Sequence, residues 1–237
     1  MADGGAYPVA ARPGSPGYDA TRARVEDYFD RTATETWARL TSDAPVSRIR
    51  QTVRAGRDRM RDLMLSRLPA DLSGARILDA GCGAGQVTAI LAGRGADVVA
   101  VDISPALVAI AERRLPEAQR HRVTFASGDM LSDTLGRFDY VVAMDSLIYY
   151  AVPDITAALD RLGERTARSV VFTVAPKTPF LMAFFTMGKL FPRADRSPVM
   201  VPHAHRTLAR RVAGRLEKVE RVTSGFYISE CLEYRPC

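Results

Sequence analysis

The chain has 237 residues, of which 47% are hydrophobic and 25% are charged. This balance argues against wholesale disorder and suits one domain with a sizeable core. The 33 basic residues exceed the 27 acidic ones, for a formal net charge of +6. Because the excess is spread along the chain rather than gathered in a dense stripe with aromatic residues, we expect no nucleic-acid partner. An anionic small molecule or an acidic membrane surface would suit this charge.

Residues 1–18 are rich in Gly, Pro and Ala and are predicted to form a flexible tail. They lack the apolar core of a signal peptide, and no stretch of the chain reaches the roughly 20 apolar residues that cross a bilayer. The three cysteines, Cys82, Cys231 and Cys237, have no paired spacing, which disfavours a disulfide scaffold and a cysteine zinc site. We therefore expect a reducing, cytosolic compartment.

Residues 19–68 are predicted to form a helical N-terminal arm. Val25, Tyr28 and Phe29 recur at helical spacing in its first part, and apolar residues between 47 and 67 do so in its second part. The second part also carries a dense run of arginines. That run is either a solvated helix face or a functional basic patch, and both interpretations stay open.

From residue 69 onward, short apolar runs alternate with helical stretches, which predicts a parallel sheet covered on both faces. The expected strands are residues 76–80, 97–101, 122–126, 138–144 and 169–174, and the expected helices are residues 86–94, 105–114 and 155–164. An insertion at about residues 176–206 breaks the order, and two alternating segments, 217–223 and 226–234, then predict an antiparallel hairpin. The fold class is therefore α/β, with a Rossmann-like, mostly parallel seven-stranded sheet in residues 69–237.

The sharpest signal is the segment Asp79-Ala80-Gly81-Cys82-Gly83-Ala84-Gly85, which follows an expected strand and opens an expected helix. Ligands of open α/β sheets bind beyond the carboxyl ends of the strands, where glycine allows a sharp turn and close approach. A plain strand-to-helix turn would not need three alternate glycines. A dinucleotide fingerprint would have its last glycine at Gln86, and Asp79 would oppose a pyrophosphate. An ammonium head and a nucleoside tail fit better, and the pattern resembles that of class I methyltransferases that bind S-adenosylmethionine.

The ends of the next two strands complete the expected nucleoside site. A carboxylate at Asp102 can accept hydrogen bonds from both ribose hydroxyls, and Ile103 would pack on the adenine. Capping of the following helix is a compatible second role for Asp102. In this fold a carboxylate at Asp129 commonly meets the adenine amino group, with Met130 on the ring, and a role in a turn is the alternative. Met144, Asp145 and Ser146, at the end of the fourth strand, should line the methyl side of the crevice.

Outside this core, several segments resemble the magnesium-protoporphyrin O-methyltransferases of chlorophyll and bacteriochlorophyll biosynthesis. They are residues 25–30, Trp37, and residues 47–57, 145–150, 191–198 and 224–227. The resemblance implies methyl transfer from S-adenosylmethionine, as co-substrate, to one propionate of magnesium-protoporphyrin IX, giving the monomethyl ester. Magnesium would arrive only within the substrate, so we expect no protein-bound metal. A methyltransferase for another apolar acid or a quinone is the alternative; a nicotinamide oxidoreductase and a non-catalytic adaptor are less favoured.

Related enzymes can carry a histidine after the fourth strand, where this chain has Ile148-Tyr149-Tyr150. A propionate is already ionised near neutral pH and needs no general base. Tyr28 and Tyr149 are therefore predicted as catalytic residues that orient the carboxylate, and the arm that carries Tyr28 and Trp37 is a candidate lid.

The insertion leaves several roles open. The apolar residues 179–191 would form a porphyrin wall, dip into a membrane interface or pack as a core helix. His203 and His205 would either reach the magnesium or, more simply, lie in a surface loop. The resemblance also suggests transient contact with magnesium chelatase through the basic second helix. Peripheral contact with the photosynthetic membrane is an open alternative, without a transmembrane span.

Overall fold

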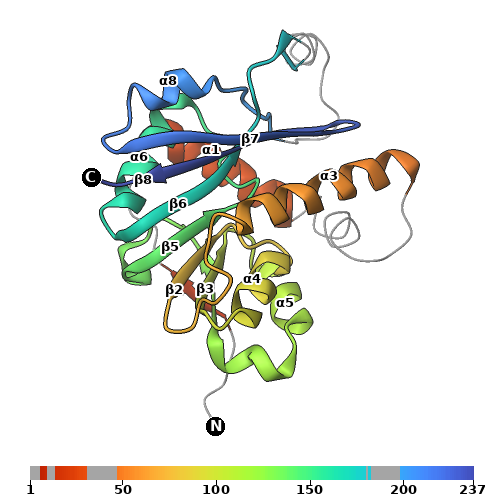
Figure 1. Cartoon of the computed structure of the whole chain (residues 1–237), viewed down its shortest axis with the longest axis vertical. Helices are drawn as coiled ribbons and strands as arrows, with labels where there is room; N and C mark the ends of the chain where they lie inside the picture. The colour runs from red at the N-terminus through yellow and green to blue at the C-terminus, as the bar shows by residue number, and fades with distance from the viewer. Residues whose placement is uncertain (1–5, 10–13, 31–46, 180, 183–197) are drawn as a thin grey trace.

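A sheet of eight strands forms the centre of the computed structural model, which describes residues 6–9, 14–30, 47–179, 181–182 and 198–237 (Figure 1). The strands are β1 (Tyr7–Val9), β2 (Arg76–Ala80), β3 (Asp97–Asp102), β4 (Val123–Gly128), β5 (Phe138–Ala143), β6 (Thr166–Val174), β7 (Arg215–Ser224) and β8 (Tyr227–Arg235). Their order is β1-β4-β3-β2-β5-β6-β8-β7, and β8 alone runs in the direction opposite to the other strands. All seven predicted strands are present, and the C-terminal hairpin is confirmed.

The helices are α1 (Pro16–Tyr28), α3 (Arg48–Leu65), α4 (Gln86–Gly93), α5 (Pro105–Arg114), α6 (Val152–Gly163) and α8 (His205–Ala209), with 3-10 turns at Glu117–Arg122 and Asp133–Leu135. Ser15, Ser47 and Ser104 are the N-caps of α1, α3 and α5, and each hydroxyl accepts a backbone N–H from the first turn. None of the described helices is long and apolar enough to cross a membrane.

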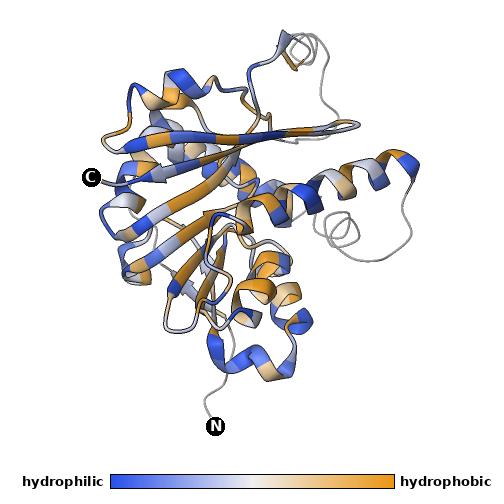
Figure 2. Ribbon diagram, in the orientation of Figure 1, coloured by the Kyte–Doolittle hydropathy of each residue, from blue (hydrophilic) through white to orange (hydrophobic). Residues whose placement is uncertain are grey.

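The helices cover the two faces of the sheet because successive strand residues point to opposite sides. In β2, Leu78 packs with residues of α6, whereas Ile77 packs with residues of α3, α4 and α5. The same alternation places Val99 and Val98 of β3 in opposite layers. Figure 2 shows hydrophobic residues concentrated along β2 and β3 in the middle of the sheet. Both faces are therefore buried, which agrees with the nearly continuous apolar strands of the sequence.

The prediction of a flexible tail over residues 1–18 is wrong where the structure describes that segment. Tyr7–Val9 pairs in parallel with residues 126–128 of β4, and α1 begins at Pro16. A strand of three residues carries too little alternation to be recognised in a Gly- and Pro-rich segment. Pairing covers the edge of β4, whose backbone groups would otherwise lack partners.

The hairpin of β7 and β8 holds α3 against the sheet. The Ser224 hydroxyl donates to the Thr52 carbonyl at 2.8 Å, and Tyr227 lies directly against Gly56. The arginines of α3 therefore have two different environments. Arg48, Arg50 and Arg59 are exposed, whereas the Arg57 side chain points inward and is only 12% exposed. Trp37, residues 191–197 and most of the apolar segment 179–191 lie outside the described residues.

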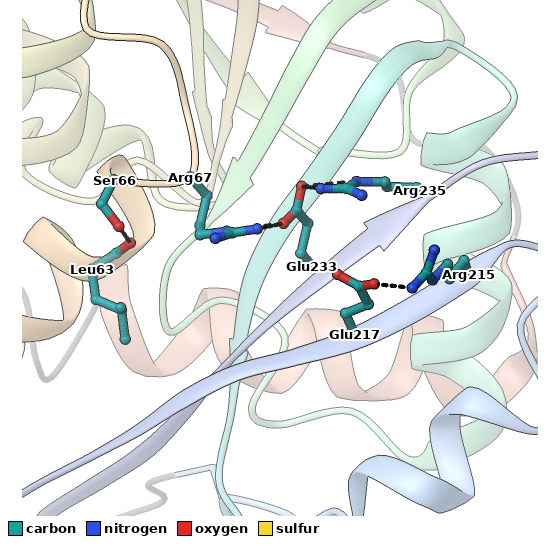
Figure 3. A network of polar contacts seen from close by, with 7 residues as sticks. All are labelled: Leu63, Ser66, Arg67, Arg215, Glu217, Glu233 and Arg235. Carbon is teal, nitrogen blue, oxygen red and sulfur yellow. Dashed lines mark hydrogen bonds and ion pairs between the residues drawn. The ribbon is translucent and has the colours of Figure 1, made fainter.

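A buried carboxylate fastens the end of α3 to β8. Both oxygens of Glu233, a residue 3% exposed, are used: Oε2 accepts from Arg67 at 2.7 Å and Oε1 from Arg235 at 3.1 Å (Figure 3). Burial alone would raise the pKa of Glu233, but hydrogen bonds and charge from Arg67 and Arg235 outweigh it and hold the pKa below its ordinary value.

Glu233→Gln is expected to destabilise the protein by about 1–3 kcal/mol at pH 7, because it removes charge-assisted hydrogen bonds from a buried site. Since the folded-state pKa is depressed, this stabilisation is present above the ordinary pKa of about 4.3 and is lost as the pH falls through the lower, folded-state value. Denaturant unfolding at pH 7 and pH 3.5 measures both effects. Glu217→Gln is the matched control, because Glu217 pairs with the exposed Arg215 and should matter by less than about 1 kcal/mol.

Candidate functional site

A cavity of about 890 Å³, including its open mouth, lies beyond the carboxyl ends of β2, β3, β4 and β5. This is the point where the strand order reverses on either side of β2, and ligands of open α/β sheets bind in that crevice. The volume is in the range of sites for small molecules. Helix α1 contributes Tyr18, Arg22, Val25 and Phe29 to the wall, so the N-terminal arm is part of the site.

The glycine loop forms the base of the cavity. Gly81 and Cys82 donate their backbone N–H groups to the Val101 carbonyl at 2.8 and 3.0 Å, which closes the loop onto β3. Gly81 has φ 83, and a Cβ there would lie under 3.0 Å from the Cβ of Ser146. Glycine is therefore required at this position by conformation and by space.

Asp79 is 1% exposed and accepts a hydrogen bond from the Thr88 hydroxyl at 2.6 Å. Burial raises the pKa of Asp79 to about 7, although the hydrogen bond from Thr88 offsets part of the shift. A buried carboxylate of this kind gains from a cationic ligand, because the ligand compensates its charge. It fits the ammonium group of a methionine-derived ligand.

The affinity for S-adenosylhomocysteine, whose amino group is an ammonium near neutral pH, is expected to fall as the pH drops below about 7. In the predicted site the ligand's ammonium would pair with the carboxylate form of Asp79, so protonation of Asp79 should cost up to about tenfold in affinity per pH unit. Calorimetric titration between pH 8.5 and 6 measures this slope. Asp79→Asn should bind more weakly at pH 8 and lose the pH dependence near 7; a variant that kept the full slope would assign it to another group.

Asp102 ends β3 and accepts two backbone hydrogen bonds, from Gly83 at 2.8 Å and from Ser104 at 2.9 Å. Burial raises the pKa of Asp102 to about 6, against the lowering effect of these two hydrogen bonds. Ser104, not Asp102, caps α5. The carboxylate therefore orders the glycine loop and still lines the cavity beside Ile103. Carboxylate oxygens can accept further hydrogen bonds, as a ribose would require.

Asp129 is 1% exposed, and its two oxygens differ. Oδ1 accepts from the Tyr18 hydroxyl at 2.8 Å and the Leu131 N–H at 2.9 Å, whereas Oδ2 is buried without a partner among the described residues. Tyr18 also stacks on Tyr150, with ring centroids 4.8 Å apart. A buried acceptor without a donor is costly. Oδ2 thus fits a ligand N–H such as the adenine amino group, and the neighbouring apolar walls fit its ring.

Arg165 supports the loop that carries this carboxylate. Its guanidinium donates to the carbonyls of Ser132 and Met130, the latter at 2.6 Å, and it lies over the Phe138 ring. Burial lowers the pKa of Arg165. The hydrogen bonds keep Met130 at the cavity wall.

Another part of the cavity wall has a different character. Met144, Asp145 and Ser146 follow β5, and Tyr149 lies beyond them on the same wall. The Ser146 hydroxyl is buried without a partner among the described residues, which makes it a second polar atom available to a ligand. Burial, and next the charge of Asp145, raises the pKa of Tyr149, so its hydroxyl stays protonated and can donate near neutral pH.

Most of the predicted site residues meet at this one cavity. Those on its wall are Asp79, Gly81, Gly83, Asp102, Ile103, Asp129, Met130, Met144 and Tyr149. Gly85 is not on the wall: it has φ 83, is the N-cap of α4, and a Cβ there would lie 2.8 Å from the Cβ of Ala111. Tyr28 is also off the wall; it packs in the small cluster of α1 with Phe29, Ile103 and Tyr149 that borders the cavity.

The expectation that His203 lies in a surface loop or reaches the magnesium is wrong. His203 is 1% exposed, its Nε2 lies 3.0 Å from the Tyr150 carbonyl, and burial lowers its pKa. His205 is part-buried, with Nε2 at 3.1 Å from the Leu216 carbonyl. Both rings therefore hold the backbone of the core together. Among the described residues, no group of three His, Cys, Asp or Glu side chains could hold a metal ion.

Sequence patterns did not assign three polar or charged wall residues to the site: Tyr18, Arg22 and Arg57. The sequence does place Asp145 and Ser146 beside Met144 on the expected methyl side, and both line the cavity. Tyr18 and Arg22 lie on an amphipathic helix whose polar and aromatic residues look like ordinary surface and core positions. Arg57 is one of many arginines in its run. An unpartnered buried oxygen is visible only once the surrounding layers are in place.

Two family models match the segments that carry most of the cavity wall. The family model "Magnesium-protoporphyrin IX methyltransferase C-terminus" matches residues 143–236, and a general methyltransferase-domain model matches residues 77–168. The chain is 64% identical over 220 residues to the magnesium-protoporphyrin O-methyltransferase of Rhodobacter capsulatus, an alignment that covers 92% of this chain and 98% of that one. It is 30% identical to the protein of that name from Synechocystis, covering 88% and 94%. The crystal structure of magnesium protoporphyrin IX methyltransferase from Synechocystis with bound SAH superposes with a TM-score of 0.80 at 27% identity, covering 91% of this chain and 100% of that one.

Proposed function

The chain belongs to the magnesium-protoporphyrin O-methyltransferase family, and from this premise we propose that its cavity transfers the methyl group of S-adenosylmethionine to a propionate of magnesium-protoporphyrin IX. The activity is a step of chlorophyll or bacteriochlorophyll biosynthesis, and S-adenosylmethionine is the co-substrate. The observation that carries the proposal is a single cavity whose wall combines two chemically different sets of side chains. One set has the acids and apolar residues that suit a nucleoside with an ammonium group, and the other has Arg57, Ser146 and Tyr149.

The reaction itself needs little from acid–base chemistry. A propionate oxygen attacks the methyl carbon, the carbon–sulfur bond breaks, and its electron pair stays on sulfur as the sulfonium becomes a neutral sulfide. The acceptor becomes an ester, and no proton moves. Because the positive sulfonium and the negative carboxylate are both neutralised, water stabilises the separated reactants more than the transition state, and a dry cavity accelerates the step.

We assign the arm the task of covering this cavity. Val25 and Phe29 of α1 are buried against Leu107 of α5, and Phe29 approaches the Tyr149 ring with centroids 6.4 Å apart. Aromatic and aliphatic side chains at that position exclude water from the bound ligands. Tyr149 donates to the reacting carboxylate from the wall, and Tyr28, which packs in the cluster bordering the wall, orients the carboxylate once the acceptor is bound. This alignment supplies the advantage of proximity.

Tyr28→Phe is expected to lower kcat by about tenfold and to change the affinity for S-adenosylhomocysteine by less than about twofold. A tenfold change is about 1.4 kcal/mol, close to the lower figure for a hydrogen bond to a charged group such as the propionate. Steady-state kinetics and ligand titration separate the two effects, with the exposed Tyr7→Phe as control. An unchanged kcat would leave Tyr28 with a packing role only.

We further propose that the porphyrin arrives from magnesium chelatase and that the exposed arginines of α3, Arg48, Arg50 and Arg59, face it. Direct handover suits an apolar, poorly soluble substrate, and a basic face attracts an acidic partner. Neutralising these arginines should reduce methylation of chelatase-supplied porphyrin while sparing porphyrin supplied in detergent. A loss of binding to anionic vesicles instead would assign the basic face to the photosynthetic membrane.

The proposed activity is tested by incubating the full chain with labelled S-adenosylmethionine and a panel of porphyrins, with and without magnesium. Label should appear in a base-labile monomethyl ester of magnesium-protoporphyrin IX. Label transfer to a quinone but to no porphyrin would contradict the proposal.

A further inference from the structure

An ion pair that the methyl-transfer scheme does not use lies on the part of the cavity wall that the proposed function assigns to the acceptor, called the acceptor end below. Arg57 of α3 donates from Nη1 to Oδ2 of Asp145, the residue after Met144. Both residues line the cavity, and the Asp145 side chain is only 6% exposed. The pair thus joins the helical arm to the end of β5 at the wall that meets the acceptor.

Two further side chains fix the Asp145 carboxylate. The Thr173 hydroxyl accepts the Asp145 backbone N–H at 2.8 Å and donates to Oδ1 at 3.1 Å, and the Tyr227 hydroxyl donates to Oδ1 at 3.3 Å. Asp145 also has φ 54, the only positive φ outside glycine among the described residues. Residues in this conformation cluster at functional sites, where the surrounding structure holds them. The fold therefore keeps this carboxylate at the cavity wall.

A carboxylate in this place poses a problem for an acidic acceptor. The wall carries four aspartates, and the proposed function assigns Asp79, Asp102 and Asp129 to the cofactor. Asp145 remains at the acceptor end. A like charge about 6 Å away, at the effective dielectric constant of a protein site, would weaken binding of an anion by roughly 10- to 100-fold. Arg57 lies where it cancels that charge.

We propose that Arg57 is a specificity-determining residue, which admits a carboxylate-bearing acceptor because its ion pair with Asp145 neutralises the acceptor end of the cavity. The inference rests on the proposed function for where the acceptor lies, and it adds the selection of the free acid against the uncharged ester. Arg57 acts through Asp145 rather than by clamping the reacting oxygen, since a bidentate guanidinium would lower the nucleophilicity of that oxygen.

The test measures binding of magnesium-protoporphyrin IX and of its dimethyl ester, by fluorescence, to the full chain saturated with S-adenosylhomocysteine. Arg57→Gln should weaken binding of the diacid by about 10- to 100-fold and leave binding of the diester within about twofold. Adding Asp145→Asn to Arg57→Gln should restore binding of the diacid, because asparagine removes the negative charge and tolerates a positive φ. Arg113→Gln, a change of the same charge at an exposed residue of α5, should alter the binding of neither ligand.

Three results would overturn the inference. They are equal losses for diacid and diester in Arg57→Gln, a double variant that stays as weak as Arg57→Gln, and a tenfold loss of diacid binding in Asp145→Asn alone. The first would mean a structural role, and the second would mean direct contact with the substrate. Retention of S-adenosylhomocysteine confirms that each variant folds. A wild-type chain that binds the diacid without methylating it would contradict the proposed function instead, and the binding comparison would still decide the role of Arg57.

Discussion

Asp102→Ala is expected to weaken binding of S-adenosylhomocysteine by at least about 100-fold. In the proposed site the carboxylate accepts two ribose hydroxyls, and charge-assisted hydrogen bonds contribute about 1.5–3 kcal/mol each. Every 1.4 kcal/mol is a factor of ten in affinity. The same substitution also removes the acceptor of the Gly83 and Ser104 N–H groups, so the loop loses part of its order. Both effects act in the same direction.

Calorimetric titration of the nucleoside, together with a thermal unfolding curve, checks this result. The matched control is Asp97→Ala, at the opposite end of the same strand, where the carboxylate is 66% exposed and pairs with Arg122. That variant should bind S-adenosylhomocysteine like the wild type. Unchanged affinity in Asp102→Ala would remove the ribose assignment.

Gly81→Ala should destabilise the folded protein by about 2–5 kcal/mol and reduce nucleoside binding. A left-handed conformation costs a residue with a Cβ about 1–2 kcal/mol, and forcing that carbon against Ser146 adds about 1–3 kcal/mol for overpacking. Both residues line the cavity, so the displacement reaches the ligand.

Two comparison variants separate the conformational cost from the steric one. Gly74 has φ 78 with nothing within 4 Å of a Cβ, so Gly74→Ala should cost only the conformational part, about 1–2 kcal/mol. Combining Gly81→Ala with Ser146→Gly should recover the steric part, about 1–3 kcal/mol. Denaturant unfolding measures all three. Equal costs at Gly81 and Gly74 would show that the close approach to Ser146 does not matter.

Local sequence predicts those site residues that lie at or just after the end of a strand. Asp79, Asp102 and Asp129 each stand at or just beyond the carboxyl end of a buried strand, and the sheet then brings those ends to one edge. Gly85 shows the limit of this reasoning. It belongs to the same glycine pattern, yet as the N-cap of α4 it faces Ala111 of α5 rather than the cavity.

The short strand β1 and the buried His203 were beyond local reasoning for a different reason. Three residues in a Gly- and Pro-rich segment carry no usable period, and pairing with the edge of β4 supplies the preference. His203 looks like a loop residue in a Pro-rich stretch, but the backbone of residues 148–150 and 175–177 surrounds it.

The sequence alone determined the α/β class, the strands of the core, the hairpin and the glycine loop, because alternation, glycine spacing and strand-end acids are local properties of the chain. The tertiary structure decided which distant groups complete the cavity. Tyr18 reaches Asp129 across 111 positions, Arg57 reaches Asp145 across 88, and Tyr227 reaches it across 82. Such contacts depend on how the arm and the hairpin pack on the two ends of the sheet, and no period or spacing within one segment encodes that arrangement.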